Sequence, residues 1–543
     1  MHDHVRLSLG RQLVFAAALI LGAPACGGAS GPGASGGTAG GGAGGGTTGG
    51  SPGSGRDGGA DSDGGATGAA GAGGATSPGE GGAAGAASGG AGGLAVGGAG
   101  GGAGRGASGG AGGAGPGGAG AGGTAGGLAG ACGQVWAGDL QLGTPLDDEI
   151  TAVTAAPGGG FYATGYEAGD TSSSDVSPGG DARATVARYD GAGQLLWETA
   201  IDTVGADTAE DLQVDRATGN LIVTGRTTGA FTGFQNAGQM DLYVMVLQSS
   251  GSELSAIQIG DERPQHPARL ALGSGKILVA GSDDIFIPSN FVAALPHGFV
   301  AQLTAGAGPT FAPTLDYWQR SALFDSKPPP PSNEDFTTGV AVDADGAVYV
   351  TSTVNGAVSL RGVFVTKLDV TGQPVWSNRF SSDPGDFVSA VGLSPNGDLI
   401  VAGAAALSLS GIELGQQDAF VAKIDKATGA VQWATATGSG ESDFATALAF
   451  DAGGNIYVTG QTLGTLAGGT SNAGGVDVFV AKIGPSGGVL STWQKGGDGD
   501  DFATGIAVDR CGAVYVGGFT TGTLVPAHPN LGRTDMFLLK PPL

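Results

Sequence analysis

The sequence predicts an all-β fold, a seven-bladed β-propeller with four strands in each blade, and three observations support that prediction. A unit of about 50 to 70 residues recurs seven times between residues 134 and 543. Each unit holds short runs rich in β-branched and aromatic residues, separated by Gly, Asp and Asn. The first and last units are incomplete in ways that complement each other, so joining them closes a ring.

The seven units align most easily at the end of their second strand. That position is occupied by Gly165, Gly225, Gly281, Ser352, Gly403, Gly460 and Gly518. In the unit that contains Gly460, residues 446–451, 455–461 and 477–483 are the first three predicted strands. A fourth strand carries a tryptophan in most units, as in residues 431–433. Four short strands per repeat are typical of propeller blades.

The two ends of the repeat region predict how the ring closes. The last unit has a third strand at residues 535–540 and lacks a fourth. Residues 134–138, which contain Trp136, have the pattern of a fourth strand but follow no third strand. We therefore expect residues 134–138 to pair with residues 535–540 and complete the last blade, which removes two exposed sheet edges.

The N-terminus has the pattern of an export signal. Basic residues precede an apolar run at residues 13–21, which is too short to span a bilayer. The following Ala23-Pro24-Ala25-Cys26 resembles the lipobox of bacterial lipoproteins. This resemblance implies that residues 1–25 are a signal peptide and that Cys26 is lipidated. A plain secretory signal that is cleaved after Ala25 is the alternative.

A low-complexity segment follows at residues 26–131. It consists mainly of Gly, Ala, Ser and Thr, and it holds 52 of the 114 glycines of the chain. Such a composition cannot bury enough apolar surface to offset chain entropy, so we expect a disordered tether. The propeller domain is then expected at residues 132–543.

The charge of the chain limits its partners. The formal net charge is −25, and the basic patch that nucleic acid binding requires is absent from the sequence. We expect no nucleic acid partner, a membrane contact only through the lipid, and a monomeric propeller that binds a protein or a glycan. No cofactor is expected, and calcium is the cation that an acidic site here would take.

The repeat resembles a known bacterial family. Asp443-Phe444-Ala445-Thr446, Asn455-Ile456-Tyr457-Val458-Thr459-Gly460 and Asp477-Val478-Phe479-Val480-Ala481-Lys482 carry the resemblance. These motifs are similar to the bacterial seven-bladed β-propeller (SBBP-type) repeat, over about residues 136–540. The match is strong in the last four units and departs most in the unit of Gly281. The resemblance implies a secreted propeller and does not imply a chemistry.

An aspartate precedes the first strand of most units. These residues are Asp148, Asp207, Asp335, Asp386, Asp443 and Asp501. Because the first strand of a blade is the innermost, we expect their side chains to surround the channel mouth on one face. One interpretation is a cation or ligand site built from converging carboxylates. The other is structural, with each carboxylate accepting backbone N–H groups from the connection between blades. The sequence names no metal.

Two cysteines remain after Cys26. Cys511 lies in the turn between the first two strands of the last blade, and Cys132 lies just before the strand expected to complete that blade. In an oxidising compartment a pair of cysteines usually forms a disulfide. We predict a Cys132–Cys511 bridge at the closure of the ring.

Other repeated residues suit packing better than chemistry. The recurring tryptophans are expected between blades, although carbohydrate sites also use Trp. The recurring lysines of the third strands are expected to be solvated or edge-protecting charges. Past the signal peptide only three histidines occur, at His266, His297 and His528, and no nucleophile motif accompanies them. No catalytic residue is therefore predicted.

The sequence favours a non-enzymatic lipoprotein that presents a propeller for binding or scaffolding. We expect it to be exported and anchored to the bacterial cell envelope, in the outer membrane or at the cell surface. The recognition surface is expected on the face with the long loops, opposite the entry of the tether. The alternatives are an extracellular propeller enzyme of lyase or hydrolase type with a site over the central channel, and a purely structural surface protein.

Overall fold

The computed structural model describes residues 134–169, 182–285, 295–306, 313–320, 334–355, 362–381, 385–405, 417–469 and 471–543. The predicted signal peptide, the predicted tether, Cys26 and Cys132 lie outside the described residues.

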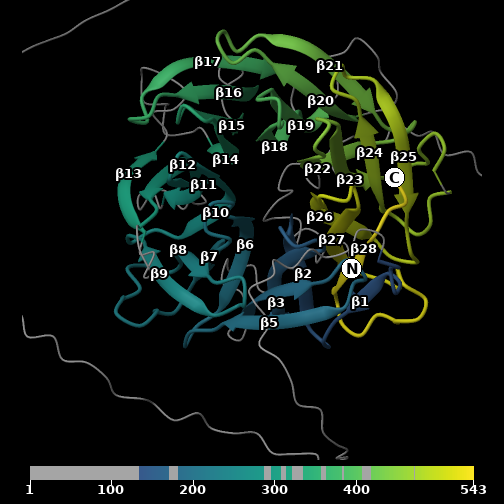
Figure 1. Cartoon of the computed structure of the whole chain (residues 1–543), viewed down its shortest axis with the longest axis horizontal. Coiled ribbons are helices and arrows are strands. Elements are labelled where there is room, and N and C mark those ends of the chain that lie inside the picture. Colours follow the sequence, from purple (N-terminus) through teal and green to yellow (C-terminus); the bar gives the residue numbers. More distant parts are fainter. Residues whose placement is uncertain are drawn as a thin grey trace, which may run out of the picture. The chain divides into compact units, whose positions relative to one another are not determined.

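The described residues form seven four-stranded antiparallel sheets in a ring, so the predicted seven-bladed β-propeller is confirmed (Figure 1). We number the blades in chain order and call the strands of each blade A to D, from the innermost outward. The innermost strands of neighbouring blades contact one another around the ring, and β2 of the first blade contacts β26 of the last.

The strand bounds are as follows. Blades 1 and 2 are β2 (Asp147–Ala155), β3 (Phe161–Gly169), β4 (Arg183–Tyr189) and β5 (Leu195–Ile201), then β6 (Asp207–Val214), β7 (Leu221–Thr227), β8 (Asp241–Leu247) and β9 (Glu253–Ile259). Blades 3 and 4 are β10 (Gln265–Gly273), β11 (Lys276–Ile285), β12 (Leu295–Thr304) and β13 (Thr314–Arg320), then β14 (Glu334–Val342), β15 (Val348–Asn355), β16 (Gly362–Leu368) and β17 (Pro374–Ser381). Blades 5 and 6 are β18 (Phe387–Leu393), β19 (Leu399–Ala405), β20 (Asp418–Ile424) and β21 (Val431–Thr437), then β22 (Asp443–Phe450), β23 (Ile456–Thr462), β24 (Asp477–Ile483) and β25 (Val489–Lys495). Blade 7 is β26 (Asp501–Val508), β27 (Val514–Thr520) and β28 (Asp535–Leu539), completed by β1 (Leu140–Leu142).

Burial of the strands follows their position in the blade. The two central strands are covered on both sides by neighbouring blades, and β23 is buried at every residue. Short continuous apolar runs are the sequence pattern of such strands. The outermost strands alternate instead, as in β5, because one of their faces meets solvent.

The hydrophobic core is divided among the joints between blades. A cluster of buried apolar side chains fills each of the seven joints. At the joint between blades 5 and 6, for example, Ala402 and Val421 pack with Val458 and Phe479. Because each cluster takes side chains from two blades, a blade depends on its neighbours for stability.

The ring closes through blade 7, but the closing strand differs from the predicted one. β1 pairs antiparallel with β28, whereas residues 134–138 form no strand. The prediction of a strand at residues 134–138 was therefore wrong in position. Gly138 has a φ of +139°, and this left-handed conformation interrupts an extended strand. Ala137 instead donates its N–H to the Ala192 carbonyl of blade 1.

The alternating strand directions give the propeller two unlike faces. The loop face carries the connections from strand D to the next strand A, and the longer B–C loops. The turn face carries the short A–B and C–D turns. Gln134 and Leu543 both lie beside the turn that contains Gly159, so the chain enters blade 7 from the turn face. Within the described ranges, no helix has the length and apolar character that crossing a membrane requires.

Candidate functional site

The six predicted aspartates are buried on the loop face, each at or next to the first residue of an innermost strand. Four of them accept the backbone N–H of the residue four positions earlier. These bonds run from Thr144 to Asp148 (2.5 Å), Thr203 to Asp207 (2.6 Å), Ser439 to Asp443 (2.6 Å) and Gly497 to Asp501 (2.7 Å). Asp335 accepts the N–H of Gly298 in blade 3, and Asp386 accepts the Ser381 hydroxyl. Except for Gly298, which lies in β12, the donors lie in or beside the connections between blades, so these carboxylates order a connection.

The structure gives no geometric support to the cation interpretation of these aspartates. Across the described ranges, His, Cys, Asp and Glu residues form no group of three or more that could hold a metal ion. Burial instead raises the pKa of Asp443 to about 6 and that of Asp501 to about 7, although hydrogen bonds from Ser439, Gly497 and Thr520 oppose the rise.

Blade 3 carries different residues at the positions where blade 6 has two neighbouring buried aspartates. In blade 6, Asp443, Thr462 and Asp477 lie side by side at the starts and ends of three adjacent strands. In blade 3 the same register places Gln265, Asp283 and His297 together. Arg263 pairs with Asp283 at 3.6 Å, and His297 Nδ1 lies 3.2 Å from Asp335 Oδ1 of blade 4. The hydrogen bond to the Asp335 carboxylate raises the pKa of His297.

A β-bulge lies near the start of every innermost strand. The bulge residue carries a hydroxyl in five blades, as Thr151, Thr338, Ser389, Thr446 and Thr504. All of these except Thr338 donate that hydroxyl to a carbonyl of the following blade. These bonds link four of the seven joints close to the channel.

Blades 2 and 3 carry Glu210 and Ala268 at the bulge, and their joint is charged instead. Arg226 lies 3.2 Å from Glu210, and its guanidinium is 2.9 Å from His266 Nδ1. Arg269 of blade 3 also extends across the channel and donates to the Thr446 carbonyl of blade 6 at 3.4 Å. A cluster of His, Arg and Glu is therefore present near the channel, and its charges pair with one another.

The repeated tryptophans pack between blades, as predicted. Trp136, Trp197, Trp376 and Trp433 each lie against a glycine in a turn of the next blade, namely Gly193, Gly251, Gly429 and Gly487. Trp136 takes this role although its backbone is not in a strand. Trp493 lies opposite Val480 and packs in the cluster between blades 6 and 7.

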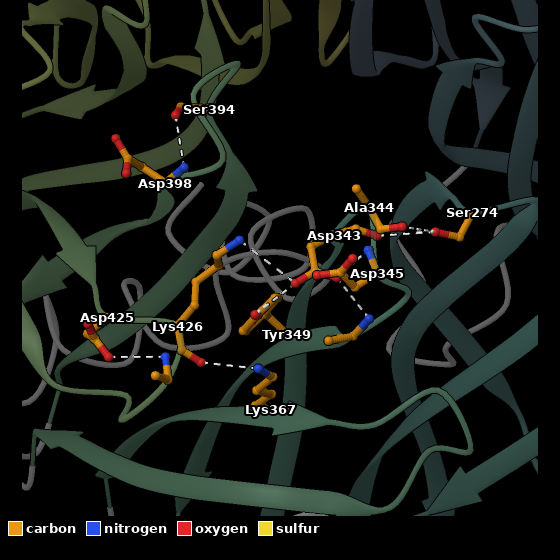
Figure 2. Close-up of polar contacts among 12 residues, drawn as sticks. Ser274, Asp343, Ala344, Asp345, Tyr349, Lys367, Ser394, Asp398, Asp425 and Lys426 are labelled. Atoms are coloured by element: carbon orange, nitrogen blue, oxygen red, sulfur yellow. Dashed lines mark hydrogen bonds and ion pairs between the residues drawn. The ribbon is translucent and has the colours of Figure 1, made fainter.

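The repeated lysines of the third strands are partly exposed, and three of them also contact an aromatic ring. Lys367, Lys482 and Lys540 lie 5.0 to 5.5 Å from the ring of a strand-B tyrosine in their own blade. Figure 2 shows one such unit on the turn face. Lys367 donates to the Lys426 carbonyl of blade 5 at 3.2 Å, and Tyr349 donates to Asp343 at 3.1 Å.

Of the two cysteines that were predicted to pair, only Cys511 lies within the described residues. Cys511 lies in the A–B turn of blade 7 and is disulfide-bonded. Its partner lies outside the described residues, so the pairing with Cys132 stays a prediction.

A pocket of 360 Å³ lies between blades 7 and 1, on the side of the loop face. β1, β28 and residues 527–531 line one side of it, and β3, β4 and β5 line the other. Its inner wall is formed by small or apolar buried residues: Ile150, Ala163, Thr185, Ala187 and Met536. Its polar lining residues are Gln141, Thr144, Asp148, Thr164, Glu167, Tyr189, Glu198 and His528.

The pocket exists because blade 1 lacks an aromatic side chain that every other blade has. In blades 2 to 7, an aromatic residue on strand C lies opposite the residue that ends the repeat motif on strand B. The aromatic residues are Tyr243, Phe299, Phe364, Phe420, Phe479 and Phe537. In blade 1 the residue opposite Gly165 is Thr185. Sequence reasoning missed this residue, although aligning the strand-C motifs would have found it.

Acidic side chains dominate the rim of the pocket. Arg183 forms an ion pair with Glu167 at 2.6 Å and lies 3.9 Å from Glu198. The hydrogen bond to Glu167 raises the pKa of Arg183, and the charges of Glu198 and Asp202 raise it further. Burial and the neighbouring Glu167 raise the pKa of Glu198. The single guanidinium of Arg183 thus lies near the carboxylates of Glu167, Glu198 and Asp202. Because the negative charges outnumber the positive one, the rim of the pocket is negative.

The fold and the ring of joints define this protein as a seven-bladed β-propeller. Searches of protein families and of curated proteins find no match to the chain. Among solved structures, Sqt1 from Chaetomium thermophilum is 14% identical with a TM-score of 0.39, over 70% of this chain and 83% of Sqt1. A protein from Lactobacillus plantarum is 12% identical with a TM-score of 0.39, over 74% of this chain and 100% of that protein. Puromycin hydrolase is 15% identical with a TM-score of 0.38, over 71% of this chain and 53% of the enzyme, so the chain spans about half the length of that enzyme.

Proposed function

We propose that this protein is a non-enzymatic binding module that is held at the bacterial cell envelope by a lipid on Cys26. The pocket between blades 7 and 1 is its recognition site. The observation that supports the proposal is the single loss of an aromatic residue, at Thr185, in a repeat that otherwise keeps one in every blade. Such a local break in a regular pattern is typical of a functional site.

The position and size of the pocket agree with this role. Its volume of 360 Å³ lies in the range of small-molecule sites, and its lining combines apolar walls with a few polar groups. It lies on the side of the loop face, where propeller loops are free to vary around a rigid ring. The lipid anchor rests on the lipobox-like sequence at Cys26, and the SBBP-type resemblance agrees with secretion.

The alternative of an enzyme over the channel has one observation in its favour, the cluster of Glu210, Arg226 and His266. Arg226 is buried and held by both partners, so its charge serves the joint between blades 2 and 3. Arg269 also occupies the channel beside this joint. A structural role for the cluster therefore fits better than a catalytic one.

Ligand-detected NMR with benzyl alcohol as the probe tests the proposed site. Saturation transfer from the protein to benzyl alcohol is expected for the wild-type chain, because the pocket accepts a ring. Thr185→Phe places a side chain where the other six blades have one, so the signal should be lost while the fold is kept. A signal that Thr185→Phe leaves unchanged would place the binding elsewhere and reject the proposed site.

A further inference from the structure

We infer that the pocket between blades 7 and 1 binds an aromatic ring that carries a positively charged nitrogen. This inference rests on the proposed function and names the class of ligand. Three features carry it: a wall shaped for a ring, a rim with an excess of carboxylates, and the short distance between them.

The wall of the pocket keeps the shape that accommodates an aromatic side chain in the other blades. In blade 6, Phe479 lies opposite Gly460, and in blade 7, Phe537 lies opposite Gly518. In five of the six blades that carry the aromatic residue the opposing residue is a glycine, and a Cβ at Gly518 would lie 1.9 Å from the Phe502 carbonyl oxygen and 2.6 Å from the Phe537 ring. Blade 1 keeps the glycine, Gly165, and shortens the opposing residue to Thr185. A ring supplied by a ligand would therefore occupy the place of the missing side chain.

The rim of the pocket selects the charge. Glu167 follows Gly165 by two residues on β3, and Glu198 pairs with Ala187 across β4 and β5. Both carboxylates line the pocket, and a single guanidinium, Arg183, pairs with them. Among the described residues, those that line the pocket include both glutamates but not Arg183. A cation is favoured at this rim, and an anion is repelled.

The ring position and the rim are close enough for one small ligand. Residues two apart on a strand are separated by about 6.6 Å and point to the same face. Glu167 therefore lies about that far along β3 from Gly165, which the ring would cover. A nitrogen one or two carbons from the ring spans this gap. Ring-bearing amines meet the requirement, whether free or as part of a peptide.

Three probes of nearly equal shape distinguish the contribution of the ring to the affinity from that of the charge. They are benzylamine, benzyl alcohol and benzoate. Isothermal titration calorimetry on the full chain at pH 7 measures their affinities. We expect benzylamine to bind about five- to tenfold more tightly than benzyl alcohol, and benzoate to bind most weakly. The preference for benzylamine should shrink as salt is added, because the carboxylates are partly exposed.

Matched variants assign the charge preference to the rim. Glu167→Gln with Glu198→Gln should make benzylamine and benzyl alcohol bind equally, without weakening benzyl alcohol. Glu253→Gln with Glu262→Gln removes the same charge from exposed positions of blade 2 and its connection to blade 3, so the preference should persist. Thermal unfolding of each variant verifies folding, and the salt dependence in the wild-type chain gives a readout that needs no variant.

The outcomes distinguish this inference from the proposed function. Equal binding of benzylamine and benzyl alcohol to the wild-type chain would overturn the cationic ligand and leave the pocket as a binding site. Absence of binding by all three probes, or binding that survives Thr185→Phe, would overturn both. Tight binding of benzoate would reverse the assigned charge and also overturn the inference.

Discussion

At the scale of single residues, the informative positions are those where a repeat departs from most of the others. Thr185 has the place of an aromatic residue, Glu210 the place of a hydroxyl, and Gln265 the place of an aspartate. Each departure changes the joint next to it rather than its own blade alone, because the core of this fold lies between blades. The regular residues at the same positions supply internal controls for mutagenesis.

Replacing the aromatic residue of a regular blade should reproduce the pocket at a cost in stability. Phe479→Thr removes a fully buried ring from the joint between blades 5 and 6 and should lower the free energy of unfolding by about 3 to 5 kcal/mol. Urea unfolding followed by circular dichroism measures the loss. Thr185→Phe is the matched reverse change and should not lower stability. Equal losses in both variants would contradict the assignment of free space to blade 1.

The buried aspartates should make the propeller more stable as the pH falls from 8 to 5. Burial raises the folded-state pKa of Asp501 to about 7, above the ordinary value of 3.8. Between these values the folded protein binds more protons than the unfolded chain, so the free energy of unfolding rises as the pH decreases. The rise is complete near the unfolded pKa and is lost above the folded one.

Calorimetric melting at constant ionic strength tests this pH dependence. Asp501→Asn should flatten the increase in Tm between pH 8 and pH 5. Asp369→Asn is the control, because hydrogen bonds from Thr371 and Gln373 lower the pKa of that exposed carboxyl and keep it ionised over this range. An unchanged pH slope in Asp501→Asn would show that this carboxyl is already ionised at pH 5.

At the scale of elements, the outermost strands are held by glutamines as well as by backbone pairing. Gln494 of β25 donates to Asp477 at 2.8 Å, and Gln258 of β9 donates to Asp241 at 2.8 Å. Gln141 has the same role in β1, where it donates to Asp535. It also accepts the N–H groups of Leu524 and Val525. Its amide donates to the Gly522 carbonyl as well, so a strand of only three residues gains four side-chain bonds.

Gln141→Ala should release β1 from blade 7. The change leaves the N–H groups of Leu524 and Val525 without their acceptor and removes one of the hydrogen bonds to Asp535, which costs about 2 to 5 kcal/mol in total. Hydrogen exchange at residues 140–142 should become fast, while exchange in β27 stays slow. Gln432→Ala on the exposed start of β21 is the control and should change neither quantity. Slow exchange at residues 140–142 in Gln141→Ala would show that backbone pairing alone holds β1.

At the scale of the whole molecule, the three cysteines connect the closure of the ring to the lipid anchor. Cys511 is disulfide-bonded, and only Cys26 and Cys132 are available as its partner in this chain. A lipidated Cys26 cannot form the disulfide, so lipidation requires Cys132 as the partner. Lipidation of Cys26 therefore requires the Cys132–Cys511 bridge, whereas the bridge by itself does not establish lipidation.

Peptide mapping of the protein from the membrane fraction, without reduction, tests both predictions. We expect one peptide pair that joins Cys132 to Cys511, and an N-terminal peptide that begins at a diacylated Cys26. A Cys26–Cys511 pair would rule out the lipid anchor. Reduction should also lower the Tm, because the bridge restricts a loop of several hundred residues in the unfolded chain.

The sequence was sufficient for the fold, because the evidence for a propeller is repeated in every blade. Seven copies of the same strands, together with complementary ends, required one ring. The position of β1 was mispredicted because Trp136 marks a packing site against Gly193 and not a strand. The pocket could not be predicted in the same way. It depends on one position, Thr185, where the aromatic side chain of the other blades is missing, and on which blades become neighbours when the ring closes.

The position of β1 gives the propeller a mechanical property. Once the predicted Cys132–Cys511 bridge is reduced, a pull on the chain before Gln134 is transmitted through β1, whose Gln141 and Leu142 also line the pocket. Tension on the N-terminal segment therefore acts on the same joint that a ligand would occupy. A ligand that contacts both β1 and blade 1 would hold the two sides of this joint together, so bound ligand should increase the force at which the ring opens. Conversely, sustained force should shorten the lifetime of the bound state.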